Sequence, residues 1–408
     1  MSVPAPDRPG ASTDHLHDAI ATEVAWLGSE LLELRRDLHA HPEPSWEEHR
    51  TTAVLLDRLA AAGLPAQASS VGTGIVLDIG EGGPLVAIRG DIDALRMPDV
   101  KAVPYRSTVP GVCHACGHDL HTTGAFGAGV ALHRVLAAAD VPGRVRLILQ
   151  PAEESLPSGA RAMVEAGVMD GVQVIFALHC DPGREVGSVG LSEGPITSAS
   201  DLVEIRLKGP GGHTGRPHLT ADLVHIAARV AVDLPMGLNR LSDPRDGINL
   251  TFGSIHAGDA GNVIPTEARL LGSLRAVGRR SWEAAPPIIE SLVRAIVEPL
   301  GATFELHHQV GGPPIVNDRW ATGLAARAAE AVVGAARVSE TEQSGGGEDF
   351  SLFLDHAPGC YLRLGVRTAG QAPYDIHTGA FDVDEAAIPI AARLLAGAAV
   401  EALADLSA

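Results

Sequence analysis

Short apolar runs alternate with segments of helical apolar spacing along the first half of the chain. The helical spacing covers residues 27–38, 47–64, 119–139 and 159–166, and the apolar runs cover residues 74–79, 85–88, 145–149 and 172–178. Strands buried on both faces of a parallel sheet have this nearly continuous apolar character. The pattern therefore predicts an α/β domain, with a mostly parallel sheet and helices on both of its faces.

The pattern changes beyond Gly194. Residues 202–207, 248–255 and 268–274 predict strands, and residues 220–241 and 291–300 predict helices, which together make an α+β insert. Residues 318–333, 361–364 and 385–406 then resume the α/β rhythm. We therefore expect a discontinuous catalytic domain over residues 1–192 and 306–408, and an inserted lid or dimerisation domain over residues 193–305. A length of 408 residues favours two domains, because single cores stop growing at about 250–300 residues.

Charge and composition exclude several classes of partner. The net charge is −19, and the sequence has no basic stripe of the kind that phosphate contacts need, so we expect no nucleic-acid partner. The chain shows no run of 18 apolar residues, and its first 17 residues show no signal-peptide pattern, so we expect no membrane anchor. The four scattered cysteines do not form a disulfide framework, which favours a cytoplasmic protein.

Residues 111–121 concentrate potential metal ligands, with two thiols, three imidazoles and a carboxylate in eleven positions. Thiolate and imidazole bind borderline-soft divalent metals such as zinc. Cys113 and Cys116 are also compatible with a redox dithiol or with half of a structural zinc site. A structural site needs four ligands, however, and Cys180 and Cys360 stand alone. The segment therefore favours a catalytic metal site, with a thiol redox protein or a silent metal-binding protein as alternatives of a different class.

Further polar residues stand where strands of the predicted sheet end. Asp93 follows one strand, Glu153 and Glu154 follow a second, and His179 follows a third. Open α/β sheets bind ligands beyond the carboxyl ends of their strands. Adjacent side chains in an extended segment face opposite ways, so one glutamate can bind metal while the other accepts a proton from a metal-bound water. A distant segment adds the imidazole of His377.

Several motifs occur in order along the chain. They are Arg-Gly-Asp-Ile-Asp-Ala-Leu at 89–95, His-Ala-Cys-Gly-His-Asp at 114–119, Gln-Pro-Ala-Glu-Glu at 150–154, Gly-His at 212–213, Pro-His at 217–218 and Gly-Glu-Asp-Phe at 347–350. This set resembles the motifs of the metal-dependent aminoacylase and amidohydrolase family. The family includes hippurate hydrolases, N-acyl-amino-acid amidohydrolases and plant auxin-conjugate hydrolases, within the carboxypeptidase-like metallopeptidases. The match begins at residue 36 and covers nearly the whole chain.

The resemblance implies a dinuclear metal site and a set of roles. Its ligands would be Cys116, His118, Glu154, His179 and His377, with Cys116 bridging two divalent ions, zinc first and manganese, cobalt or nickel as alternatives. Glu153 would be the general base and later the acid, and Asp93 would hold a ligand in place. His213 would stabilise the oxyanion, often across a dimer interface. Asn262 and Arg275 would bind the substrate carboxylate, although Arg275 is equally compatible with a surface ion pair.

The function implied is hydrolysis of the amide bond of an N-acyl or N-aroyl amino acid by a homodimer. A carboxypeptidase or dipeptidase of the same superfamily is the alternative that motif spacing does not separate. Three positions depart from the family pattern: Arg96 replaces a usual proline, Cys113 a usual methionine, and Gly347 a usual serine or alanine. None of these departures removes an expected ligand.

Overall fold

The computed structural model describes residues 13–139 and 141–408. The N-terminal segment without a signal-peptide pattern therefore lies largely outside the described residues. The described chain divides into two compact units. Unit 1 comprises residues 13–194, 316–342 and 352–408, and unit 2 comprises residues 195–315 and 343–351. The short strands β6 (Gly194–Pro195) and β13 (Val316–Asn317) lie where the chain passes from one unit to the other.

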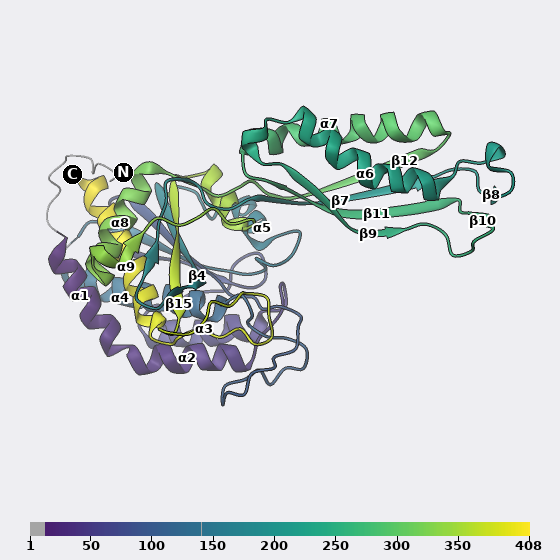
Figure 1. Cartoon of the computed structure of the whole chain (residues 1–408). Helices are drawn as coiled ribbons and strands as arrows, with labels where there is room; N and C mark the ends of the chain where they lie inside the picture. The colour runs from purple at the N-terminus through teal and green to yellow at the C-terminus, as the bar shows by residue number, and fades with distance from the viewer. Residues whose placement is uncertain (1–12, 140) are drawn as a thin grey trace. The chain divides into compact units, whose positions relative to one another are not determined.

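Unit 1 is built on a seven-stranded sheet (Figure 1). In order across the sheet, the strands are β1 (Ile75–Glu81), β3 (Gly143–Gln150), β2 (Leu85–Asp91), β4 (Val174–Glu185), β15 (Gly359–Arg367), β5 (Val189–Gly190) and β14 (Val338–Ser339). The pairs β3/β2, β2/β4, β4/β15 and β5/β14 are parallel, whereas β1/β3 and β5/β15 are antiparallel. All of β2 is buried, as expected for a strand covered on both faces. The predicted mostly parallel α/β sheet is confirmed.

The helices of unit 1 are α1 (Asp14–Trp26), α2 (Gly28–Ala40), α3 (His49–Ala61), α4 (His118–Ala139), α5 (Gly159–Glu165), α8 (Arg319–Val333) and α9 (Ala387–Ser407). Figure 1 shows α1, α4, α8 and α9 together on one side of the sheet, where they pack against one another. The α9 helix is long and apolar enough to cross a membrane, but 78% of its apolar window is buried within the protein. Its apolar composition is therefore accounted for by its place in the core.

A buried carboxylate, that of Glu401, connects α9 to two other helices of this layer. Glu401 accepts hydrogen bonds from Arg327 on α8 (2.6 Å), from His17 on α1 (3.0 Å) and from the hydroxyl of Thr13. Burial alone would raise the pKa of Glu401, but these partners outweigh it and lower the pKa to about 2. The interaction joins the N-terminal helix to the C-terminal helix.

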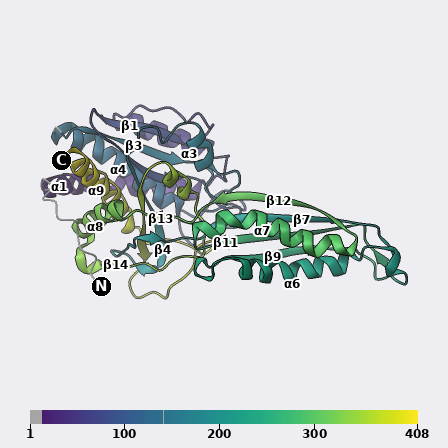
Figure 2. The ribbon, with the colours of Figure 1, turned by 90° about the horizontal axis from the view of Figure 1, so that it is seen from above.

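Unit 2 is an antiparallel sheet with two helices on one face (Figure 2). Its strands, in the order β12 (Thr303–Gly312), β7 (Ala199–Lys208), β11 (Glu267–Ala276) and β9 (Asn249–His256), are covered by α6 (Leu223–Leu241) and α7 (Arg279–Val297). Buried residues alternate along β7 and β11, because only one face of the sheet meets the helices. This is the α+β arrangement predicted for the insert.

Three elements differ from the sequence-based expectations. The predicted end of the insert at residue 305 falls inside β12, an edge strand whose polar character hid it. The predicted helix at 291–300 starts already at residue 279, because a buried face including Ala285 and Ile289 keeps Pro286 and Pro287 within α7. The α1 helix was not predicted.

Candidate metal centre

The carboxyl ends of three parallel strands lie at one edge of the unit 1 sheet. Asp91 at the end of β2 is paired with Gln150 at the end of β3, and the pairing of β2 with β4 ends at Ala177. His179 therefore lies two residues beyond the last residue of β4 that pairs with β2, although β4 itself does not end at residue 178 as predicted. The strand continues to Glu185 because it pairs with β15. The edge is where ligands bind in open α/β sheets.

The structure brings all five predicted metal ligands together at this edge. The Cys116 Sγ lies 3.3 Å from Nε2 of His179, and Nε2 of His377 lies 3.1 Å from Oε1 of Glu154. His118, the first residue of α4, has its Nε2 4.0 Å from that same glutamate oxygen. Ligand atoms within 4.8 Å of one another form several overlapping groups, among them Cys116 with His118 and His179, Cys116 with Glu154 and His377, and His118 with Glu153 and Glu154. Two groups share Cys116, as a thiolate that bridges two ions requires.

Two imidazoles are oriented with one nitrogen directed into the cluster. Nδ1 of His118 donates to the carbonyl oxygen and the carboxylate of Asp93, at 3.0 and 3.1 Å. Nδ1 of His179 donates to the carbonyl oxygen of Cys180 at 2.7 Å. Metal-binding histidines are typically oriented by such a bond from their second nitrogen. The buried Nε2 of His118 has no hydrogen-bond partner, which fits a nitrogen that binds a cation.

The electrostatics of the cluster also favour a cation. Burial alone would lower the pKa of His118, but Asp91 and Asp93 outweigh it and raise the pKa to about 10. Burial, followed by the charge of Glu154, raises the pKa of the Cys116 thiol well above its usual range. A thiolate therefore needs a positive charge beside it, and a divalent ion that coordinates a thiol deprotonates it. The donor set fits thiolate- and imidazole-binding metals.

The Asp93 carboxylate connects the cluster to two other segments. Its Oδ2 accepts hydrogen bonds from Oγ of Ser45 (2.6 Å) and from the backbone N–H of Glu154 (3.0 Å). Asp93 thus holds His118, as the resemblance implied, and it also holds the chain at Glu154. Sequence analysis missed Ser45, whose only signal was its position nine residues after residue 36, where the match begins.

Two other polar residues of the 111–121 segment, His121 and Asp119, support the cluster from outside. Nδ1 of His121 donates to Asp91 (2.7 Å), and its Nε2 accepts the N–H of Cys180 (2.9 Å), so both nitrogens are engaged. Asp119 forms an ion pair with the Arg35 guanidinium (2.7 Å) and a hydrogen bond with His39 (2.8 Å), two residues of α2 that the sequence analysis did not identify. These contacts join α2 to the start of α4.

The two thiols of the Cys-x-x-Cys pair have different surroundings. All four cysteines are free and buried, so Cys113 and Cys116 are not joined. The backbone of Cys113 pairs with Leu95, and burial raises the pKa of its thiol to about 11. Reactive thiols have a lowered pKa and partial exposure, and Cys113 has neither.

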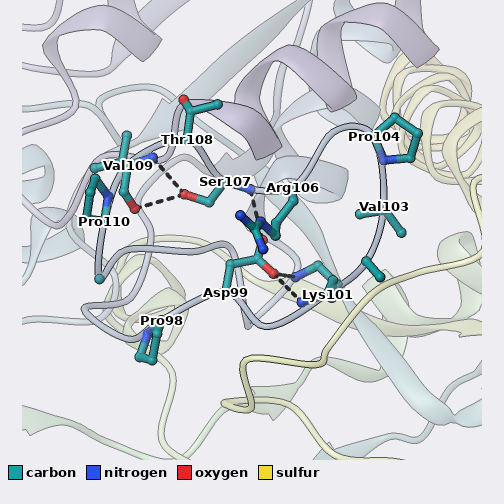
Figure 3. A pocket seen from close by; sticks show the side chains of 12 residues that line it. Pro98, Asp99, Lys101, Val103, Pro104, Arg106, Ser107, Thr108, Val109 and Pro110 are labelled. Atoms are coloured by element: carbon teal, nitrogen blue, oxygen red, sulfur yellow. Dashed lines mark hydrogen bonds and ion pairs between the residues drawn. The ribbon is translucent and has the colours of Figure 1, made fainter.

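A cavity of about 660 Å³ lies in the loop that follows Arg96, lined by residues between Pro98 and Gly111 (Figure 3). Asp99 organises this loop by accepting the backbone N–H groups of Lys101 and Ser107 and by pairing with the Lys101 ammonium at 3.0 Å. The lining includes none of the predicted site residues. Arg96 forms an exposed ion pair with Glu47.

In unit 2, His213 and Asn262 lie together. His213 on β8 (Gly212–His213) is paired with Val263 on β10 (Val263–Ile264), and the carbonyl oxygen of Asn262 accepts the N–H of Thr214 at 3.2 Å. Both side chains are exposed. They lie beyond the end of β11 at which Glu267 pairs with Lys208.

Arg275 lies near the opposite end of β11, paired with Ser200. Eight residues of strand, about 27 Å, separate Arg275 from Glu267, so one copy of the chain does not bring Asn262 and Arg275 together. Arg275 forms no ion pair with the described residues, and its Nη1 is buried without a hydrogen-bond partner. Burial lowers the pKa of Arg275, because a charged guanidinium is costly to bury without a counter-ion. An anionic partner that accepts a hydrogen bond from Nη1 would offset this cost.

The side chains of Ser200 and Arg275 explain why residue 347 is a glycine. A Cβ at this position would lie 2.2 Å from Cβ of Ser200 and 2.8 Å from Nη1 of Arg275. A serine or alanine at residue 347 would therefore displace the guanidinium. The departure from the family pattern accommodates Arg275.

Comparison with known proteins agrees with this fold and cluster. Residues 87–401 match the model of peptidase family M20/M25/M40. The chain is 36% identical to an N-acetylcysteine deacetylase of Bacillus subtilis, over 91% of this chain and 96% of that protein. It also resembles a solved Bacillus subtilis structure described as a dinuclear metal binding peptidase from the M20 family, with a TM-score of 0.79 and 32% identity over 93% of this chain and 99% of that one.

Other relatives are named as an amidohydrolase and as a carboxypeptidase. A Geobacillus stearothermophilus N-acyl-L-amino acid amidohydrolase is 35% identical, over 74% of this chain and 80% of that protein. A Saccharolobus solfataricus protein named thermostable carboxypeptidase 2 is 33% identical, over 92% of this chain and 96% of that protein. The chain is 44% identical to a longer Rhodococcus jostii protein but spans only 46% of its length.

The fold and the cluster together define a two-unit α/β protein of the metallopeptidase type. The chain belongs to peptidase family M20/M25/M40, because the family model covers most of it and several relatives match it over nearly their full length.

The surroundings of the two thiols generate a prediction about metal content. We expect Cys116→Ser to retain clearly less divalent metal per chain than the parent protein, because it removes the ligand that two groups share. Cys113→Ser should retain the parent's metal content. Elemental analysis after dialysis against metal-free buffer measures both, and equal loss in the two variants would favour a thiol-pair site instead.

Proposed function

We propose that this protein is a metal-dependent amide hydrolase that releases an amino acid from an N-acyl or N-aroyl conjugate. One observation carries the proposal: the Glu153 carboxylate lies at the edge of the ligand cluster, with Oε2 3.9 Å from Nε2 of His118. A carboxylate beside a candidate metal centre can move a proton without being needed as a ligand. Relatives named as deacetylase and N-acyl-L-amino acid amidohydrolase support the substrate class.

The proposed cofactor is a pair of divalent ions held by Cys116, His118, Glu154, His179 and His377. Zinc suits the thiolate and imidazole donors best, and manganese, cobalt or nickel are alternatives. When bound, such ions polarise a carbonyl group and acidify water. The name of the related dinuclear peptidase supports the number of ions.

The chain's own residues would divide the proton transfer and orientation between them. Glu153 would accept the proton of the attacking water and return it to the leaving amine. Its side chain is 10% exposed, and the neighbouring ligand side chains of Glu154 and His377 are 13% and 49% exposed, so water reaches this side of the cluster. Asp93 would keep His118 in the required orientation. We propose that His213 stabilises the oxyanion and that Asn262 and Arg275 bind the substrate carboxylate.

A carboxypeptidase or dipeptidase remains the second candidate, and the thermostable carboxypeptidase relative favours it specifically. A thiol redox role for Cys113 and Cys116 has less support, since burial raises the pKa of both thiols. We also propose a cytoplasmic location, in which the four free thiols would stay reduced.

A substrate panel tests the function directly. We expect the purified protein to hydrolyse N-acetyl-L-cysteine, hippurate or another N-acyl amino acid faster than any unblocked dipeptide. A chelator should abolish the activity, and added zinc or manganese should restore it, because the proposed ions polarise the carbonyl. Amino acid release is measured with and without metal. A preference for unblocked peptides would support the second candidate, and the absence of any metal-dependent hydrolysis would contradict both.

Glu153→Gln tests the proposed proton acceptor. We expect kcat to fall by about 10²- to 10⁴-fold, because the amide cannot accept the proton. Metal content and the thermal unfolding midpoint should stay near the parent's, since the substitution preserves size. A variant that keeps near-normal kcat would show that another group is the base.

We propose that the protein is a homodimer formed through unit 2. Val224, Ala228, Val232 and Met236 form an exposed stripe at every fourth residue of α6, and three of them are 49–61% exposed. The adjacent β9 is an edge strand of the sheet. A second copy that covers this face explains the stripe. It would also allow Asn262 of one copy and Arg275 of the other to serve one substrate.

The double variant Val232→Glu, Met236→Glu tests the dimer. We expect its mass in solution, measured by light scattering after gel filtration, to fall from two chains to one, because two carboxylates would be buried in the interface. Ala284→Glu adds a charge to an exposed position of α7 and should leave the mass unchanged. If the double variant keeps the parent's two-chain mass, or if the parent is already a single chain, the proposed interface is wrong.

A further inference from the structure

A buried glutamate outside the ligand set, Glu48, contacts the segment that carries Glu153. Its side chain is fully buried in the chain between α2 and α3. Oε1 of Glu48 accepts the backbone N–H groups of Ala152 (2.8 Å) and Trp46 (3.0 Å), and Oε2 accepts the hydroxyl of Thr73 (2.9 Å). Each of these partners is neutral, and none of the basic side chains in the described residues forms an ion pair with Glu48.

A carboxylate at this position is unfavourable by itself. Burial is the largest cause that raises the pKa of Glu48, and the nearby charge of Asp93 raises it further. Hydrogen bonds from Thr73 and Ala152 act in the opposite direction. Burying a charge without a cationic partner is costly unless several hydrogen bonds compensate. Two backbone N–H groups and a hydroxyl that converge on one side chain provide that compensation.

The peptide that Glu48 holds is conformationally unusual. Ala152 has φ 53°, in the left-handed region that residues other than glycine seldom adopt. Its carbonyl oxygen accepts the N–H of Gly159 at 2.9 Å. A Cβ on Gly159 would lie 1.7 Å from the carbonyl oxygen of Pro151, so only glycine permits this approach. The backbone at Ala152 is therefore held from both sides, by Glu48 at its N–H and by Gly159 at its oxygen.

The stretch that carries Glu48 also holds the chain beyond Ala152, at Glu154 and at Pro157. Ser45 donates to Asp93, which accepts the backbone N–H of Glu154. Trp46 donates its indole N–H to the carbonyl oxygen of Pro157 at 3.0 Å. Residues 45–48 thus contact the chain before and after the two glutamates.

We propose that Glu48 is a positioning residue that orients Glu153 through the backbone of Ala152. The proposal rests on the proposed function, in which Glu153 transfers the proton. Rotation of the Ala152 peptide would turn the side chain of Glu153 away from the ligand cluster, because the two residues are adjacent. Misplacement of a reacting group by about 1 Å can cost about 100-fold in rate.

Three substitutions separate hydrogen bonding from charge. Glu48→Gln keeps an oxygen for both backbone N–H groups, and its amide can donate to the Thr73 hydroxyl. Glu48→Asp keeps the charge, but it is one methylene shorter and does not reach Ala152. Glu48→Ala removes both the charge and the hydrogen bonds. We expect kcat to fall about 10- to 100-fold in the Asp and Ala variants and to stay within about threefold of the parent in the Gln variant. KM and metal content should change less than about twofold in all three.

Backbone hydrogen exchange supplies a readout that does not depend on activity. Peptides that cover residues 151–156 should exchange about tenfold faster in Glu48→Asp and Glu48→Ala than in the parent, and at the parent's rate in Glu48→Gln. Glu401→Ala is the matched control, because it removes another buried glutamate with several partners, at the contact of α9 with α1 and α8, three helices that carry none of the ligands. It should lower stability without changing kcat or the exchange of residues 151–156.

The outcomes distinguish this proposal from the proposed function. Unchanged exchange over residues 151–156 in the Asp and Ala variants would overturn the role of Glu48, whatever the activity. So would normal kcat in the Asp variant with loss in the Gln variant, because charge would then matter rather than the bond to Ala152. If the parent hydrolyses no amide, or if Glu153→Gln stays active, the proposed function fails. The exchange data still decide whether Glu48 holds the segment.

Discussion

The buried carboxylate of Asp93 is the contact on which the arrangement of the candidate centre depends. It accepts hydrogen bonds from His118 at the start of α4, from Ser45 between α2 and α3, and from the backbone N–H of Glu154 after β3. Burial raises the pKa of Asp93, but the bond from His118 leads the contributions that outweigh it and lower the pKa below its usual value. One ionised group therefore fixes three segments that are distant in sequence.

This concentration of negative charge explains the character of the surrounding residues. Asp91, Asp93, Glu153 and Glu154 crowd around buried imidazoles at one sheet edge, where a cation is the natural counterpart. The side chains behind them are satisfied by protein groups: His121 by Asp91 and Cys180, and Asp119 by Arg35 and His39. These two side chains are thus engaged by protein groups, whereas Nε2 of His118 has no hydrogen-bond partner and remains available to the cluster. Such a division is expected of a site that binds a cation.

Much of the site could be predicted from short motifs. Cys116 and His118 are two residues apart at the start of a helix, and Glu153 and Glu154 are adjacent after a strand, so local spacing identified all four. His377 stood out only as a distant imidazole, and its ligand role, like those of the other residues, depended on the resemblance to a known family. Ser45, Glu48, Arg35 and His39 were missed, because each acts through a partner more than 45 residues away, and no local pattern marks such a pair.

The apolar periodicity of the sequence by itself determined the α/β class, the α+β insert and most of the helices, since burial of one helix face or of whole strands leaves a local signature. Strand pairing was decided only in the tertiary structure. Pairing with β15 extends β4 past His179, and pairing with β7 places β12 in unit 2. The tertiary structure also decided which nitrogen of His118 faces the cluster, and it separated Asn262 from Arg275 along β11. These features depend on contacts between residues far apart in the chain, which periodicity does not record.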